Sequence, residues 1–232
     1  TDGLKCYRFA VRWGAATNTD DAEGEVNARA DIRPDREGIV ALLPTFRGQI
    51  EQVPPQFSAV KIDGQRAYAR ARAGEMSQLA ARPLWVEQLD LIEQPDPDTA
   101  VFEMVCGKGG YVRALGRDLG VALGCHGHVL WLRRIWSGPF DAEDGVDLQT
   151  VAAEARTPAL EARLLPLFTA LSYVLLFPCA AVPAARLRHG NPAPVLGSAG
   201  YGDPAWASHC GHPVAVGIYR AGALHPSRVF NL

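Results

Sequence analysis

The sequence predicts an α+β protein with two parts, and three observations support this. Residues 7–13 alternate large apolar side chains with arginine or alanine, which indicates a strand with one buried face. Residues 111–123 instead repeat apolar side chains at helical spacing. After Pro166, proline, glycine and histidine become frequent and the apolar runs shorten. We therefore expect a larger domain of strands and helices at 1–165 and a small β-rich domain at 166–232.

The other elements follow in chain order. A short helix is expected over 39–46, and a helix over 65–73 should end at Gly74 in a left-handed cap. Residues 141–165 have the pattern of connecting helices. Strands are expected at 57–62, 84–92, 100–106 and 129–135, with turns at Thr17–Gly24, Asp63-Gly64, Pro95–Asp98 and Arg220-Ala221-Gly222.

Composition is typical of a globular protein of the cytoplasm. Of the 232 residues, 48% are hydrophobic and 21% are charged. The five cysteines form no C-x-x-C pair, so a reducing compartment is expected and a disulfide framework is not. Two Cys/His clusters, at 125–128 and 209–212, also lack such a pair, so no metal site is predicted. No apolar run is long enough to span a membrane, and a monomer is expected.

The distribution of charge is more informative than the net charge of −2. Basic residues outnumber acidic ones by three in each of the segments 54–82 and 101–140. Such stretches are typical of solvated faces, but they also suit contacts with RNA phosphates. The chain has only three lysines (Lys5, Lys61 and Lys108), although its lysines and arginines together number 23.

Ordered sequence blocks then point to one family. The two most specific blocks are QVPPQFSAVKIDG at 52–64 and CGKGGYVR at 106–113. Others, in the same order along the chain, are KCYRF at 5–9, TNTDDAEG at 17–24, DLG at 118–120, LGCHGH at 123–128, LRR at 132–134 and SGPF at 137–140. In order and spacing the chain resembles the TruB family of tRNA pseudouridine synthases.

The resemblance implies a fold and an activity. It implies a mixed, mainly antiparallel sheet with flanking helices, followed by a PUA-like domain. It implies a cytoplasmic isomerase that converts the T-loop uridine 55 of tRNA to pseudouridine without a cofactor or metal, with the tRNA T-arm as partner. The family's catalytic aspartate lies in a G-x-L-D-P block, which this sequence does not contain. We therefore expect that aspartate upstream of Thr1 and little activity from these residues alone. The alternative is a non-catalytic tRNA-binding or tRNA-folding module.

Four residues match the family's uridine pocket. By resemblance, Tyr7 stacks on the flipped uracil and helps to remove its C5 proton, and Arg113 pairs with the catalytic carboxylate. Tyr111 and Leu132 match positions that line the pocket. Core packing is the competing interpretation for Tyr7, Tyr111 and Leu132, and a surface position in the first helical turn is the competing one for Arg113. With its aspartate absent, Arg113 is predicted to lack its main ion pair.

Further expectations concern RNA contacts and the incomplete sheet. Contacts with phosphate are predicted for Lys61, Lys108, Arg133 and Arg134, with solvated side chains as the alternative. Asp21 is expected to order its own loop, and nothing recommends Asp20, Asp21, Asp63 or Asp118 as a substitute nucleophile. Two departures from the family pattern, Asn18 for Asp and Gly110 for Thr, put fine positioning in doubt. An exposed sheet edge and reduced stability are also predicted.

Overall fold

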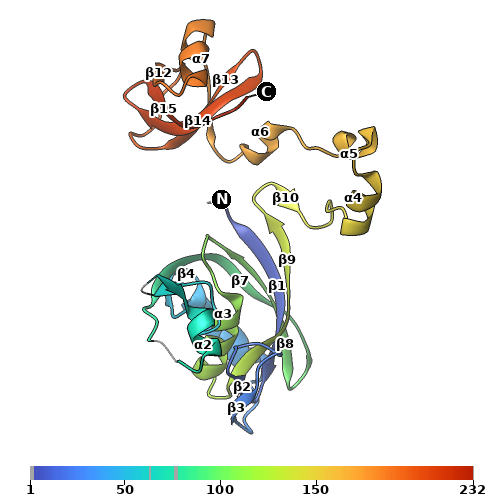
Figure 1. Ribbon diagram of the computed structural model, residues 1–232. Coiled ribbons are helices and arrows are strands. Elements are labelled where there is room, and N and C mark those ends of the chain that lie inside the picture. The colour runs from blue at the N-terminus through green and yellow to red at the C-terminus, as the bar shows by residue number, and fades with distance from the viewer. Residues whose placement is uncertain (1–2, 63, 76–77, 232) are drawn as a thin grey trace. The chain divides into compact units, whose positions relative to one another are not determined.

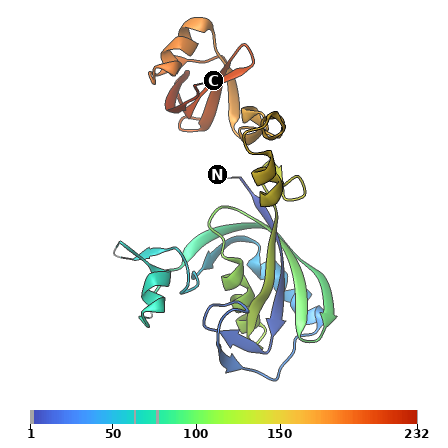
Figure 2. The ribbon, with the colours of Figure 1, turned by 45° about the vertical axis from the view of Figure 1, so that its right-hand side comes forward.

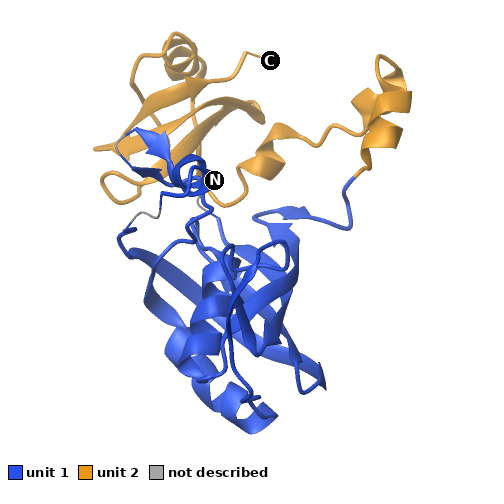
Figure 3. Ribbon diagram, turned by 60° about the horizontal axis from the view of Figure 1, so that its bottom comes forward, with its two compact units in different colours: residues 1–145 blue, residues 146–232 orange. Residues whose placement is uncertain are grey.

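The computed structural model describes residues 3–62, 64–75 and 78–231. The chain divides into two compact units, Thr1–Gly145 and Val146–Leu232 (Figure 3). This division places helices α4 (Leu148–Glu154) and α5 (Pro158–Ala162) in the second unit, although we had assigned them to the first domain. The predicted domain boundary after residue 165 remains a prediction.

A six-stranded antiparallel sheet forms the framework of the first unit, in the order β10-β9-β1-β8-β7-β4 (Figure 1). Its strands are β1 (Lys5–Trp13), β4 (Gly48–Gln52), β7 (Arg82–Asp96), β8 (Thr99–Cys106), β9 (Gly127–Ser137) and β10 (Phe140–Asp141). Two hairpins flank it, β2 (Ala15–Thr17) with β3 (Val26–Arg29) and β5 (Lys61–Ile62) with β6 (Gln65–Arg66). The predicted, mainly antiparallel sheet is confirmed.

One face of this sheet carries the core. The odd-numbered side chains Phe9, Val11 and Trp13 of β1 are at most 1% exposed, as the alternation predicted. They belong to one buried cluster with residues of α1 (Arg36–Leu42), the 3₁₀ helix η1 (Leu43–Phe46) and α3 (Val112–Ala122). Figure 2 shows α3 lying against this face of the curved sheet.

The outer edge of β9 is largely open, as predicted for an incomplete sheet. Residues Asp20–Ala22 contact it at Val129 through backbone hydrogen bonds of 2.9 and 3.0 Å, and β10 pairs with it at Trp136 and Ser137. Between these points no other strand of the described residues pairs with this edge. Leu130, Trp131 and Leu132 are accordingly 38–47% exposed.

Two predicted elements differ from the structure. The strand predicted at 57–62 is reduced to Lys61–Ile62, because the carbonyls of Ser58 and Val60 accept bonds from Tyr68 and Ala67 instead of a partner strand. The helix predicted from residue 65 begins only at Ala67, as α2 (Ala67–Arg72). Gly74 follows it with φ +82°, the expected left-handed cap. The predicted Asp63-Gly64 turn includes a residue outside the described ranges.

The second unit is β-rich, as predicted. Its five-stranded sheet has the order β11-β13-β14-β15-β12, with one parallel pair, β11 and β13. Its elements after α4 and α5 are α6 (Leu167–Ala170), β11 (Leu175–Pro178), α7 (Ala181–Arg188), β12 (Ala193–Pro194), β13 (Pro204–His209), β14 (His212–Arg220) and β15 (Ala223–Val229). The predicted hairpin turn joins β14 to β15, where Ala221 and Gly222 both have positive φ.

Candidate active site

Arg113 is the centre of the candidate site. It lies in the first turn of α3, which begins after Tyr111 in extended conformation. Its Nη1 donates to the carboxylate of Asp21 at 2.9 Å and to the carbonyl of Thr19 at 3.1 Å. Its Nη2 donates to the carbonyl of Phe57 at 2.9 Å. One guanidinium therefore joins three of the sequence blocks that the resemblance identified.

Arg113 was predicted to lack its main ion pair, the one with the catalytic aspartate, but it does have a carboxylate partner among these residues. The Asp21 carboxylate neutralises it, with both side chains about a quarter exposed. Asp21 also orders its own loop, as expected, because its Oδ1 accepts bonds from Thr19 Oγ1 and from the backbone of Glu23. From the sequence we predicted only the role of Asp21 in its loop. Asp21 and Arg113 are 92 positions apart, and no local pattern indicates that they form a pair.

Tyr111 is fixed by a partner that sequence analysis missed. The side chain of Gln52 accepts from the Tyr111 backbone N–H at 2.9 Å and donates to its carbonyl at 3.0 Å. Gln52 is only 3% exposed, so these bonds satisfy a buried amide. The Tyr111 ring packs against the small cluster of Val60, Ala67 and Leu79. The signal available in the sequence was the position of Gln52 at the head of the first motif block.

Tyr7, Leu132 and Arg134 lie on the core face of the sheet. In the antiparallel register Tyr7 lies opposite Arg134, and Phe9 lies opposite Leu132. Directly opposed residues point to the same face. Tyr7 is partly buried and packs against the core cluster that includes Val112, the neighbour of Arg113. Leu132 is 47% exposed, which leaves its side chain accessible.

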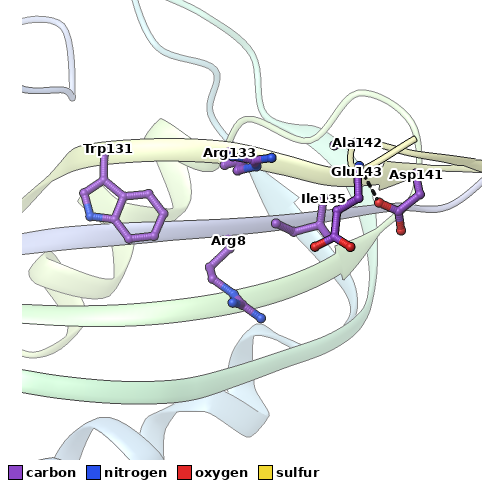
Figure 4. Close-up of a pocket in the computed structure, with 7 residues that line it drawn as sticks. All are labelled: Arg8, Trp131, Arg133, Ile135, Asp141, Ala142 and Glu143. Atoms are coloured by element: carbon purple, nitrogen blue, oxygen red, sulfur yellow. Dashed lines mark hydrogen bonds between the residues drawn. The ribbon is translucent and has the colours of Figure 1, made fainter. Parts of the chain in front are cut away.

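Arg133 lies on the other face. It lies opposite Arg8 in the strand register. Together they line a pocket of about 300 Å³, whose other lining residues are Trp131, Ile135, Asp141, Ala142 and Glu143 (Figure 4). The two neighbouring arginines that we predicted as RNA contacts therefore point away from each other. Lys61, in β5, and Lys108, in the turn before α3, are both exposed. Contact of these four residues with RNA remains a prediction.

The two departures from the family pattern have clear local consequences. Asn18 Oδ1 accepts a bond from the Glu25 backbone at 3.1 Å, which an aspartate oxygen would do equally well. Gly110 is closely packed, because a Cβ there would lie 3.1 Å from a methyl of Leu84 and 3.2 Å from Cys106 Sγ. A larger side chain at this position would require these two side chains to shift by a few tenths of an ångström.

A second arginine lies one turn further along α3. Arg117 Nη1 donates to Asp20 Oδ2 at 2.9 Å, and its Nε donates to Asp118 Oδ1 at 2.9 Å. Its Nη2 donates to the carbonyl of Val53 at 2.8 Å. Burial raises the pKa of the Asp20 and Asp118 carboxyls, and Arg117 opposes that rise in both.

Within the described ranges, neither a cluster of metal-ligating side chains nor a membrane-spanning helix is found. No group of three or more His, Cys, Asp or Glu side chains is placed to hold a metal ion there. No helix among the described residues is long and apolar enough to cross a bilayer.

Solved structures share this fold. The chain aligns with a chain of a Cbf5-Nop10-Gar1 complex at a TM-score of 0.73 and 20% identity, covering 99% of this chain and 67% of that one. It aligns with a chain of an H/ACA RNP bound to a substrate RNA containing 2'-deoxyuridine at a TM-score of 0.72 and 17% identity, covering 100% and 67%. These likenesses define the class: an α+β core with a small β domain after it, as found in the Cbf5 complex.

Sequence comparison gives the family. Residues 1–112 match the TruB family pseudouridylate synthase N-terminal domain, and residues 113–172 match the tRNA pseudouridylate synthase B C-terminal domain. The chain is 60% identical to tRNA pseudouridine synthase B of Cereibacter sphaeroides, covering 100% of this chain and 77% of that protein. It is 61% identical to that of Ruegeria pomeroyi, covering 99% and 76%. The chain belongs to the TruB family of pseudouridylate synthases.

Proposed function

We propose that this chain forms the uridine-binding side of a synthase that converts uridine 55 of the tRNA T-arm to pseudouridine. The observation that carries the proposal is the Arg113 guanidinium, which joins Asp21, Thr19 and Phe57 beside Tyr111. These contacts use three of the five N–H groups of the guanidinium, so it can still donate to a second carboxylate and favour its ionised form. The sequence identity to the Cereibacter and Ruegeria synthases supports the same reaction.

The reaction assigns a task to each residue of the site. The target uridine is flipped out of its loop, because its C5 atom is otherwise stacked and out of reach. Tyr7 stacks on the uracil, and Leu132 and Tyr111 line the pocket. The C–N glycosidic bond breaks, the uracil turns, a C–C bond forms at C5, and the C5 proton leaves with help from the Tyr7 hydroxyl. Arg113 holds the carboxylate that acts on the ribose.

That carboxylate is the missing element. No G-x-L-D-P block occurs within the 232 residues. The side chain of Asp21 already accepts bonds from Arg113, Thr19 and Glu23, so it is occupied in ordering the loop. We propose that the catalytic aspartate is supplied from outside this sequence and that residues 1–232 alone bind tRNA without forming product.

The test compares two proteins on an unmodified tRNA transcript. One is the chain of residues 1–232; the other is a fusion that adds the part of the Cereibacter synthase outside the matched region. We expect tRNA binding by both and pseudouridine from the fusion only, with Asp→Asn in the G-x-L-D-P block that the family resemblance implies for the added part as the inactive control. Binding without product from the fusion as well would favour the tRNA-binding module. Product from residues 1–232 alone would refute the proposed absence of the carboxylate.

A further inference from the structure

Arg117 connects two loops that also meet Arg113. It holds Asp20, the neighbour of Asp21, and the carbonyl of Val53, four residues before Phe57. Arg113 holds Asp21 and Phe57 themselves. The two arginines are one helical turn apart, so they project from the same side of α3. Together they bind the 17–24 loop through Asp20 and Asp21, and the 53–57 segment through the carbonyls of Val53 and Phe57.

The charge of Arg117 is balanced by two carboxylates of the protein. Each of its three nitrogens already donates to an oxygen of the protein, at 2.8–2.9 Å. It is 24% exposed, and its partners Asp20 and Asp118 are 12% and 33% exposed. A guanidinium with both neighbouring carboxylates in place carries no net attraction for phosphate. A direct role in binding the tRNA backbone is therefore disfavoured.

Its partner Asp20 is in turn anchored to the sheet. The backbone of Asp20 is left-handed, with φ +62°, and its carbonyl accepts from Val129 of β9 at 3.0 Å. The contact from Arg117 to Asp20 thus ties α3, the 17–24 loop and β9 into one unit. The position of Asp21, one residue on, follows from this arrangement.

We infer that Arg117 is a positioning residue that sets the place of Asp21 and of the Phe57 carbonyl around Arg113. Its catalytic consequence rests on the proposed function, whereas its structural consequence does not. A positioned arginine raises the rate of the chemical step without contributing to tRNA affinity. Lysine at residue 117 retains the charge, but its single ammonium does not reproduce the fork that spans Asp20, Asp118 and Val53.

The first measurement is independent of activity. In the ¹⁵N NMR spectrum of residues 1–232, the Arg113 guanidinium should rotate slowly, because its hydrogen bonds restrain it, and should give separate signals for its two Nη atoms. In Arg117→Gln and Arg117→Lys we expect the Arg113 guanidinium to rotate faster, so that its two Nη signals merge into one. The matched control is Arg47→Gln. Arg47 likewise donates to a carboxylate and to a carbonyl, but its partners Asp90 and Leu89 lie on β7. Unchanged Arg113 signals in both Arg117 variants would overturn the inference.

The second measurement is the single-turnover rate of the product-forming protein, alongside its Kd for tRNA. We expect Arg117→Gln to slow product formation roughly 10- to 100-fold, with Kd changed less than about threefold. Arg117→Lys should be nearly as slow, and Arg47→Gln should keep the parent rate. Full rescue by lysine, or a loss confined to Kd, would contradict the positioning role. If no protein forms product, the proposed function fails and the NMR result alone decides.

Discussion

Gly120 of α3 and Gly127 of β9 lie backbone against backbone. A Cβ at Gly120 would lie 2.8 Å from Gly127 Cα and still closer to its nitrogen. A Cβ at Gly127 would lie 2.9 Å from the carbonyl oxygen of Gly116 and 3.0 Å from the ring of Trp13. This close approach seats the helix that carries Arg113 and Arg117 against the sheet.

The first prediction follows from this contact. Gly120→Ala should lower the free energy of unfolding by about 3 kcal/mol or more, because the new methyl meets backbone that cannot rotate away. Gly116→Ala is the matched control in the same helix. Its Cβ would lie 3.0 and 3.3 Å from methyl groups of Val129 and Val11, and 3.8 Å from the nearest backbone atom, so a loss of about 1 kcal/mol or less is expected. Urea unfolding checks both, and equal losses would contradict the backbone contact.

The second prediction uses the opposite faces of Arg133 and Arg134. Arg134 shares the face of Tyr7, so Arg134→Ala should weaken tRNA binding and reduce the salt dependence of log Kd by about one phosphate contact. Arg133→Ala removes a neighbouring guanidinium from the pocket on the other face. It should leave both quantities nearly unchanged. Filter binding between low and moderate salt tests the pair, and a larger effect at Arg133 would place the tRNA on the pocket face.

The third prediction concerns pH. Burial raises the pKa of Asp20 above its ordinary value of 3.8. The folded chain thus holds this proton more tightly than the unfolded chain, so the contribution to stability is largest below pH 3.8 and is lost as the pH rises through the folded-state pKa. Relative to Asp20→Asn, the parent chain should therefore lose stability as the pH rises from about 3 to about 7.

Asp98 provides a control of opposite sign. A hydrogen bond from Arg33 lowers the pKa of the exposed Asp98 carboxyl. The contribution of Asp98 to stability is present at pH values above the ordinary aspartate pKa. It is lost as the pH falls through the lowered folded-state pKa. Urea unfolding of Asp20→Asn and Asp98→Asn across this range should give opposite slopes against the parent chain. Parallel slopes would show that Asp20 ionises as an exposed carboxyl does.

The fourth prediction separates the five thiols. Burial raises the pKa of Cys6 and of Cys106 to about 11 each, and raises that of Cys125 and Cys179 as well. Cys210 is the exposed cysteine, in the β13–β14 turn. Iodoacetamide at about pH 8 should modify Cys210 first and the other four only after unfolding. Peptide mass spectrometry checks the order, and Cys106 labelling at the rate of Cys210 would show that its strand opens in the native state.

Local patterns in the sequence determined much of this protein. The alternation over residues 7–13 defines β1, and helical spacing over 111–123 defines α3, because both patterns depend only on near neighbours. The ordered motif blocks identified the family, which the comparisons confirmed. They also selected Tyr111 and Arg113, which lie at the start of α3.

The pairing of distant groups was decided by the tertiary structure. The partner of Arg113 is Asp21, and the partner of Tyr111 is Gln52, yet nothing in either pair's local sequence encodes the other. The predicted strand at 57–62 failed for the same reason, since its backbone bonds go to the Ala67 and Tyr68 amides and to Arg113. Sequence patterns record which side chains prefer burial. Hydrogen-bond partners depend on which segments the fold brings within 3 Å.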